Sequence, residues 1–193
     1  MVGLFGGSFD PIHHGHLIVA RVAAEVLGLE EVRFVPAREQ PFKVGRHSAP
    51  AAHRAAMVRL AIAGAGGFAV ETIELERQGA SYTVDTLRAL REREPGIEPV
   101  LLIGADAAAD FPKWREAEAV AELARIVVFG RAGAEPATAS PAWRTIEVPA
   151  IEMSATEIRR RVRHGLPIRY WVPDAVAEYV ATHGLYQDGD GEG

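Results

Sequence analysis

The chain has 193 residues, a formal net charge of −5 and no cysteine. Its length suits one domain that buries about 70% of the surface exposed by the unfolded chain, and 48% hydrophobic with 24% charged residues is typical of a globular protein. The lack of cysteine excludes disulfides, thiolate metal sites and cysteine nucleophiles. Because the charge is negative and no apolar run is long enough to span a bilayer, we expect no nucleic acid or membrane partner and a cytoplasmic location.

Short apolar strands alternate with helices along the chain. In chain order the first half predicts strand 2–5, helix 15–27, strand 31–36, helix 51–63, strand 68–73 and helix 83–93. The second half predicts strand 99–103, helix 116–123, strand 125–129, strand 145–148 and helices 154–164 and 173–183. This alternation is typical of an α/β protein whose mostly parallel sheet is covered by helices on both faces.

The pattern also predicts where a ligand binds. In such doubly wound sheets, ligands lie beyond the carboxyl ends of the strands, where the strand order reverses. Strand 2–5 ends in a Gly-Gly loop and strand 99–103 ends at Gly104, so these two strands best suit the crevice. We expect a single domain over residues 1–187, mobile loops at 38–50 and 132–142, and a disordered tail at 188–193.

Residues 6–16 read Gly-Gly-Ser-Phe-Asp-Pro-Ile-His-His-Gly-His and join the first strand to the first helix. Gly6 and Gly7 let the backbone approach a ligand closely, and the unpaired amides of the helix N-terminus favour phosphate. His13 and His16 are three residues apart, so both rings can lie on one face of the helix start. Two other interpretations are a capped turn with surface histidines and a metal site in which at most two of the three histidines share an ion.

A second candidate phosphate site lies at residues 153–159, Met-Ser-Ala-Thr-Glu-Ile-Arg, where the penultimate helix begins. Ser154 and Glu157 fit a capping box, which would account for both residues. Capping leaves Thr156 and Arg159 unexplained. A helix N-terminus with two hydroxyls and a following arginine suits an anion.

Both motifs resemble known signatures. The first is similar to the nucleotidyltransferase signature G-x-F-x-P-x-H-x-G-H, and its Gly-Gly-Ser-Phe-Asp-Pro wording resembles the bacterial nicotinate-nucleotide adenylyltransferase family. The second resembles that family's I-S-S-T-x-I-R signature, from which it departs at Met153 and Ala155. The change at Ala155 removes one hydroxyl and leaves the backbone amide as the contact there. Four further stretches look like this family: 81–87, 104–106, 111–114 and 178–186.

The resemblance implies a Rossmann-like, doubly wound sheet of the nucleotidyltransferase type with C-terminal helices. It also implies adenylyl transfer from ATP to nicotinate mononucleotide, which gives nicotinate adenine dinucleotide and pyrophosphate, with Mg²⁺ bound through the ATP phosphates. The implied catalytic residues are His13, His16 and Arg159. The implied ATP-binding residues are these three with Gly6, Gly7, Ser8, Phe9, Gly104, Asp106, Ser154 and Thr156, and the implied mononucleotide-binding residues are Lys43, Thr83 and Trp114.

Simpler structural roles exist for several of these residues. Trp114 would pack beneath a loop, Thr83 would cap its helix, Asp106 would cap a turn, and Lys43 would be an exposed loop charge. The activity also has alternatives, namely another phosphorylated acceptor such as nicotinamide mononucleotide or phosphopantetheine, or a nucleotide-sensing module without turnover. A class I aminoacyl-tRNA synthetase shares the histidine motif, but this chain lacks the size and the basic surface. The sequence leaves open whether the chain forms a homo-oligomer.

Overall fold

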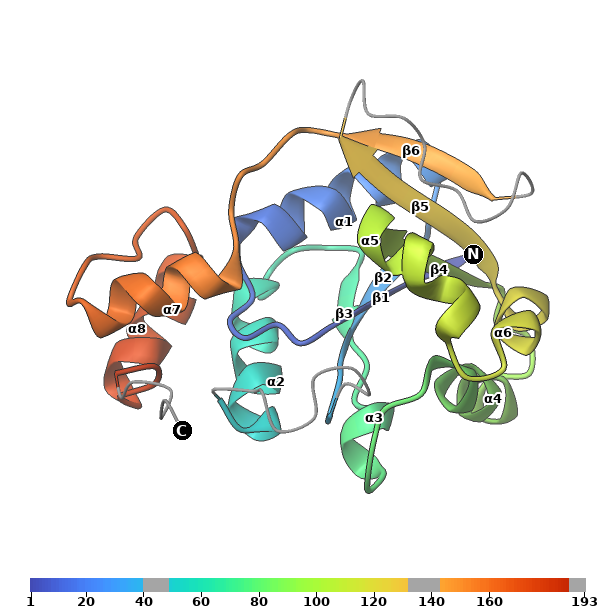
Figure 1. Ribbon diagram of the computed structural model, residues 1–193, viewed down its shortest axis with the longest axis horizontal. Coiled ribbons are helices and arrows are strands. Elements are labelled where there is room, and N and C mark those ends of the chain that lie inside the picture. Colours follow the sequence, from blue (N-terminus) through green and yellow to red (C-terminus); the bar gives the residue numbers. More distant parts are fainter. Residues whose placement is uncertain (40–48, 132–142, 188–193) are drawn as a thin grey trace.

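A parallel sheet forms the centre of the molecule (Figure 1). The computed structural model describes residues 1–39, 49–131 and 143–187, and within these ranges six strands pair in the order β3-β2-β1-β4-β5-β6. The strands are β1 (Val2–Gly7), β2 (Glu31–Pro36), β3 (Phe68–Val70), β4 (Pro99–Gly104), β5 (Arg125–Arg131) and β6 (Arg144–Val148). The order reverses between β1 and β4, which confirms the doubly wound fold and places its crevice at the carboxyl ends of these two strands.

Helices cover both faces of this sheet (Figure 1). The helices in the described residues are α1 (His14–Leu27), α2 (Ala51–Ala61), α3 (Ile73–Glu76), α4 (Thr83–Arg93), α5 (Ala105–Asp110), the 3₁₀ helix η2 (Phe111–Lys113), α6 (Ala117–Leu123), α7 (Ala155–Arg163) and α8 (Asp174–Thr182). Helices α1, α2, α7 and α8 contribute side chains to one core, and α4, α5 and α6 contribute to the other.

Alternation along each strand produces the two cores. Leu4 of β1 packs on the side of α4 and α6, whereas Phe5 packs on the side of α1 and α2. In β4, Leu102 belongs to the Phe5 side and Leu101 to the Leu4 side. Successive side chains of a strand point to opposite faces, so a strand that is buried on both faces needs an unbroken apolar run. This is why the strand predictions at 2–5 and 99–103 are confirmed.

The main error of the sequence analysis concerns the strand predicted at 68–73. It ends at Val70, and Ile73 begins the four-residue helix α3. The cause is Glu71, a buried residue whose Oε1 accepts a hydrogen bond from the Ile73 N–H at 3.0 Å and turns the chain out of the sheet. The short helices α5 and η2 were not predicted either, and the longer helices agree with their predictions to within two residues at each end.

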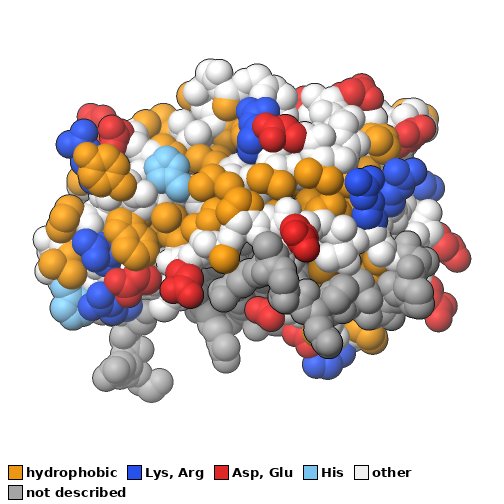
Figure 2. Space-filling view, turned by 90° about the horizontal axis from the view of Figure 1, so that it is seen from above, with side chains coloured by type: hydrophobic (Ala, Val, Ile, Leu, Met, Phe, Trp, Pro, Cys, Tyr) orange, Lys and Arg blue, Asp and Glu red, His pale blue; other side chains and the backbone are white. Residues whose placement is uncertain are grey.

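The surface is mixed in character. Figure 2 shows a face on which hydrophobic side chains form a band across the middle and charged side chains lie mostly toward the edges. Large hydrophobic side chains that are exposed include Ile18 and Val26 of α1, and Tyr170 between α7 and α8. In the ranges that the structure describes, no helix has the length and hydropathy needed to cross a bilayer.

Candidate active site

The first motif connects β1 to α1 through a tightly packed loop. Phe9 has a left-handed backbone (φ 48°) and is only 2% exposed, with its ring against Phe5, Phe34 and His16. A Cβ atom on Gly7 would lie 2.9 Å from the Phe9 ring, so this packing requires glycine at position 7. The side chain of Phe9 therefore belongs to the core, and only its backbone is left to contact a ligand.

His13 and His16 lie on one face at the start of α1, as their spacing predicts. Their rings stack with centroids 3.7 Å apart and an interplanar angle of 24°. The backbone N–H of His13 donates to His16 Nδ1 at 3.2 Å. The neutral His16 ring therefore carries its proton on Nε2. A Cβ atom on Gly15 would lie 3.0 Å from His13 Nδ1, so Gly15 leaves room for the His13 ring.

Both imidazoles are neutral at physiological pH. Burial, with a smaller effect of His14, lowers the pKa of His13 to about 4. Burial, with a smaller effect of His13, lowers the pKa of His16 well below its usual value. Two stacked rings of this kind can donate N–H groups to an anion without carrying charge before it binds.

The second motif lies against the first. Arg159 Nη1 donates to the Asp10 carbonyl at 2.9 Å across 149 residues of sequence, and Arg159 Nη2 approaches Thr156 Oγ1 at 3.4 Å. Ser154 is the N-cap of α7 and its Oγ accepts from the Glu157 N–H at 3.2 Å. The Glu157 carboxylate pairs with Arg160 at 2.7 Å instead of reaching back to the cap, so the predicted capping box forms only on the serine side.

Two buried side-chain nitrogens in the described residues have no hydrogen-bond partner. They are His13 Nδ1 and Arg159 Nε, one in each motif. Buried polar atoms in folded proteins are nearly always hydrogen-bonded, and an unpaired one needs an explanation such as a missing ligand. His13 Nδ1 faces the His16 backbone N–H in the capping box of α1, so the stronger sign of a missing ligand is Arg159 Nε, whose guanidinium is held beside the first motif by the Asp10 carbonyl.

A buried network that the sequence analysis missed holds this region together. Asp10 is 4% exposed, and its Oδ1 accepts from the Tyr186 hydroxyl at 2.7 Å and from the Ala49 N–H at 3.2 Å. Burial and the neighbouring Asp10 raise the pKa of Tyr186, so its hydroxyl stays a donor. Asp10 and Tyr186 each had a sequence signal, since Asp10 belongs to the first motif and Tyr186 ends one of the stretches that resemble the family, but their contact with each other was not predicted.

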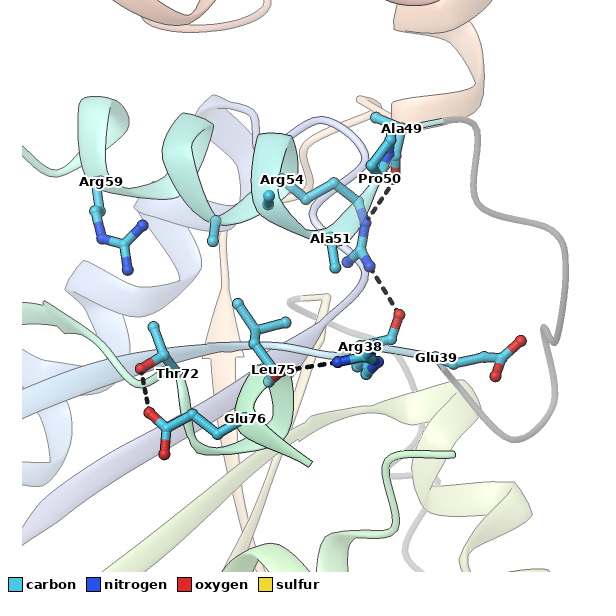
Figure 3. A pocket seen from close by; sticks show the side chains of 12 residues that line it. Arg38, Glu39, Ala49, Pro50, Ala51, Arg54, Arg59, Thr72, Leu75 and Glu76 are labelled. Atoms are coloured by element: carbon cyan, nitrogen blue, oxygen red, sulfur yellow. Dashed lines mark hydrogen bonds between the residues drawn. The ribbon is translucent and has the colours of Figure 1, made fainter. Parts of the chain in front are cut away.

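Arg54 of α2 is the second missed residue. Its guanidinium is 1% exposed and donates to three carbonyls, those of Ser8 at 2.6 Å, Arg38 at 3.0 Å and Ala49 at 3.1 Å. Figure 3 shows the bonds to Arg38 and Ala49 at the edge of a cavity of about 920 Å³. Arg54 thus ties the end of β2 and the start of α2 to the first motif. An arginine surrounded by alanine and methionine in a buried helix was the available signal.

A separate cavity of about 780 Å³ opens at the carboxyl ends of β1 and β4. Predicted site residues from both strands and from the segments that follow them line it. They are Gly6, Gly7, Thr83, Gly104, Asp106 and Trp114. The position matches the strand reversal that the sequence analysis expected, and Gly6 and Gly7 connect this cavity to the histidine motif.

The structure distinguishes the simpler structural roles of these residues, helix capping and packing, from a place in the cavity wall. Tyr82 is the N-cap residue of α4 and Thr83 is its first residue, so Thr83 does not cap the helix. Trp114 packs on Phe111 at 5.2 Å between ring centroids and also lines the cavity. Gly104, not Asp106, is the N-cap residue of α5. The predicted Lys43 lies outside the described residues.

Metal ligands are a further point of comparison. Within residues 1–39, 49–131 and 143–187, no three histidine or carboxylate side chains come close enough together to hold an ion. His13 and His16 stack on each other, which is not the arrangement of two ligands that point at one ion from different directions.

Comparison with known proteins places the chain among nucleotidyltransferases. The cytidylyltransferase-like family model matches residues 4–161. A "probable nicotinate-nucleotide adenylyltransferase" of a Roseiflexus species is 48% identical over 196 residues, covering 96% of this chain and 98% of its own, and one of Thermus thermophilus is 47% identical over 186 residues, covering 96% and 99%. The nicotinic acid mononucleotide adenylyltransferase of Plasmodium falciparum, solved in complex with NaAD, matches with a TM-score of 0.77 at 20% identity over 97% of this chain and 98% of its own. At that identity the structural match supports the fold alone.

Proposed function

The chain belongs to the nicotinate-nucleotide adenylyltransferase family, enzymes that transfer an adenylyl group from ATP to nicotinate mononucleotide in NAD biosynthesis, and from this premise we propose how its residues divide the reaction. The phosphate oxygen of the mononucleotide attacks the α-phosphorus of ATP. The bond from the α-phosphorus to the oxygen that bridges to the β-phosphorus breaks, and pyrophosphate leaves with that oxygen. Since the nucleophile is already a phosphate oxygen, the protein has to supply positioning and charge stabilisation rather than a base.

His13 and His16 are proposed to donate N–H groups to the phosphates of ATP. The hydrogen bond from the backbone N–H of His13 fixes the tautomer of the His16 ring, so the Nε2–H of His16 is available as a donor before the substrate binds. Because burial keeps both rings neutral, they add no charge to the empty site, and a bound phosphate would raise both pKa values. The amides of Gly7, Ser8 and Phe9 would complete this part of the ATP site.

The second motif is proposed to bind the same phosphates from the opposite side. Arg159 is held by the Asp10 carbonyl, and its unpaired Nε adds a charged donor where negative charge develops on the leaving group. Thr156 and the N-terminus of α7 behind Ser154 supply neutral donors. Burial of Arg159 Nε without a partner is the observation that favours this role over a purely structural one.

The cavity at the ends of β1 and β4 is proposed to hold the two nucleosides. Gly104 and Asp106 would contact the adenosine ribose, while Trp114 would stack on the pyridine ring. The Thr83 and Val84 amides precede the hydrogen-bond ladder of α4, which begins with the Asp85 and Thr86 amides on the Tyr82 carbonyl, so with the Thr83 hydroxyl they can read the carboxylate of nicotinate. The mononucleotide contact of Lys43 remains part of the proposal.

The proposed site suits Mg²⁺ that is bound through the phosphates of ATP. The donors gathered by the two motifs are mainly N–H and hydroxyl groups, and Asp10 Oδ1 is already engaged by Tyr186 and Ala49. The ion would therefore take phosphate and water oxygens as ligands, and would neutralise phosphate charge during transfer. We also propose a cytoplasmic location, where ATP is available.

The observation that carries the proposal is the buried, partnerless Nε of Arg159, which the Asp10 carbonyl holds beside the loop that ends at His13. The test is pyrophosphate release from ATP and Mg²⁺ with nicotinate mononucleotide, nicotinamide mononucleotide or phosphopantetheine as the acceptor. We expect turnover with the first, much less with the second and none with the third. A chelator should stop turnover and Mg²⁺ should restore it. Equal catalytic efficiency with both mononucleotides, or a requirement for tightly bound zinc, would contradict the proposal.

A further inference from the structure

A buried carboxyl forms part of the wall of the nucleoside cavity. Glu74 of α3 is 9% exposed and lines the same cavity as Thr83 and Trp114. It belongs to neither phosphate motif, and α3 was not foreseen from the sequence. A carboxyl close to a site for an anionic ring is unexpected, because like charges repel, so its presence calls for a positive reason.

The polar contacts of Glu74 are made with α4 and with the segment that precedes it. Thr86 Oγ1 donates to Glu74 Oε1 at 2.8 Å and itself accepts from Arg77 Nη2 at 2.6 Å. The Ser81 hydroxyl lies close enough to the carboxyl to lower its pKa. Glu74 thereby meets the first turn of α4 at Thr86 and the segment that leads into it at Ser81.

This segment carries the groups proposed to recognise the pyridine ring. Ser81 is fixed to the end of β2, since its Oγ accepts from the Arg38 N–H at 3.0 Å and its N–H donates to the Glu39 carbonyl at 2.8 Å. Thr83 and Thr86 are three residues apart and lie on one face of α4, so Thr83 borders the cavity one turn before Thr86 meets Glu74. A shift at Glu74 would move the first turn of α4 directly.

The surroundings also limit the charge that Glu74 presents to the cavity. Burial raises its pKa, whereas the hydroxyls of Thr86 and Ser81 and the charge of Arg77 lower it, and Glu71 raises it slightly. Arg77 reaches the carboxyl through Thr86, so a compensating positive charge lies close to Glu74.

We propose that Glu74 is a positioning residue that sets the preference for an acid ring over an amide ring by fixing the first turn of α4. The inference rests on the proposed function, because it concerns the ring that this cavity binds. Discrimination between the acid and the amide ring requires hydrogen-bond donors held where the carboxylate oxygens lie. When a donor moves, a hydrogen bond to the charged carboxylate loses more binding energy than a hydrogen bond to the neutral amide.

The test uses Thr86, which is 4% exposed and is absent from the described residues that line the cavity. A change in substrate preference on altering Thr86 would pass through its partners, which are Glu74, Arg77 and the Tyr82 carbonyl, and the Glu74 variant below separates the first of these from the other two. Thr86→Val keeps the shape and removes the hydroxyl. We expect it to raise the KM for nicotinate mononucleotide about tenfold, to lower the acid-to-amide ratio of kcat/KM by about the same factor, and to change the KM for ATP less than about twofold. Thr86→Ser, which keeps the hydroxyl, should restore the preference, and Glu74→Gln should shift it in the same direction as Thr86→Val.

Glu71→Gln is the matched control. Glu71 is a buried carboxylate two residues before α3 that pairs with Arg93 and is not among the described residues that line the cavity. The amide oxygen of glutamine can keep its bond to the Ile73 N–H, so α3 stays in place while the charge is removed. This variant should lose stability without a change in the acid-to-amide ratio. The proposal is overturned if Thr86→Val lowers kcat/KM equally for both rings, if Thr86→Ser behaves like Thr86→Val, or if Glu71→Gln shifts the ratio as much.

Two checks keep the result clear. Circular dichroism shows whether each variant folds. If Thr86→Val does not fold, calorimetry measures the affinity of Glu74→Gln for each of the two mononucleotides. An unchanged ratio of the two affinities would then contradict the proposal. Failure of the proposed function would be seen separately, as an unmodified protein that releases no pyrophosphate with nicotinate mononucleotide.

Discussion

The two ends of the site are constructed differently. At the end proposed to bind phosphate, His13 and Asp10 are buried and two imidazoles stack. Hydrogen bonds reach this end from the distant residues Arg159 and Tyr186. At the nucleoside end, Trp114 and Thr83 are half-buried and Asp106 is exposed. In the proposed assignment, the phosphate end is therefore held by buried hydrogen bonds before any substrate binds, whereas the nucleoside end relies on backbone amides, one aromatic ring and a supporting network behind them.

The difference follows from what each end has to do. Stabilising charge in a transition state requires donors that are already in place, since reorganising them would cost part of the gain. The residues that recognise a ring can be more exposed to solvent, because stacking and hydrogen bonds to the ring stabilise the bound substrate as well as the transition state. Substitutions at the phosphate end should therefore reduce turnover, and substitutions at the nucleoside end should change substrate preference.

The largest expected effect is that of His16→Ala. Removal of one preorganised donor should reduce kcat by about 10²–10³, and circular dichroism should show an intact fold. His14→Ala is the control, since His14 is adjacent but half-buried and outside the stacked pair, and it should keep near-normal turnover. Near-normal turnover of His16→Ala would show that the phosphate end does not act as described.

Arg159→Ala should weaken the use of ATP. Loss of hydrogen bonds to a charged group should raise the KM for ATP about tenfold to hundredfold, with a smaller change for the mononucleotide. Steady-state kinetics with each substrate varied in turn measures both constants. Arg160→Ala, which removes only the exposed pair with Glu157, should leave them unchanged. A rise for the mononucleotide alone would move Arg159 to the other end of the site.

The buried histidines should make folding stability depend on pH. The pKa of His13 is about 4 in the folded protein and 6.5 in its unfolded reference, so between these values the unfolded chain binds more protons and stability falls as the pH is lowered. From pH 7 to pH 5, His13 alone should reduce the free energy of unfolding by about 2 kcal/mol. Urea unfolding at the two pH values measures this loss, and His13→Gln should lack that part of it. An equal loss in the variant would mean that His13 is not the cause.

The smallest expected effects concern the pyridine ring. Thr83→Val should narrow the preference for nicotinate over nicotinamide mononucleotide by about threefold to tenfold, the value of one hydrogen bond. Trp114→Ala should weaken both mononucleotides alike, because stacking does not distinguish an acid from an amide. The measurement is kcat/KM for each acceptor. A change in preference in Trp114→Ala, with none in Thr83→Val, would reverse the two roles.

The sequence determined much of this molecule because its strongest patterns are local. Unbroken apolar runs identified β1 and β4, and spacing alone placed His13 and His16 on one face of α1. The strand order could be narrowed to a doubly wound sheet, since parallel strands need crossover helices. The ends of the elements were predicted less well. The predicted strand at 68–73 was longer than β3, because no local pattern shows that Glu71 is buried and turns the chain.

Only the tertiary structure decided which residues support the site. Arg54, Asp10 and Glu74 act through contacts with residues 12 to 176 positions away, and nothing in their immediate neighbours reveals such a partner. Glu157 fitted a capping box by spacing, yet its carboxylate pairs with Arg160, because a local pattern offers competing partners of similar energy. The sequence by itself determined the main helices and strands and the position of the histidine motif at the start of α1, since both depend on short-range periodicity and spacing. Tertiary contacts decided the buried polar network, since a charged side chain can be buried only where the folded chain brings its partners to it.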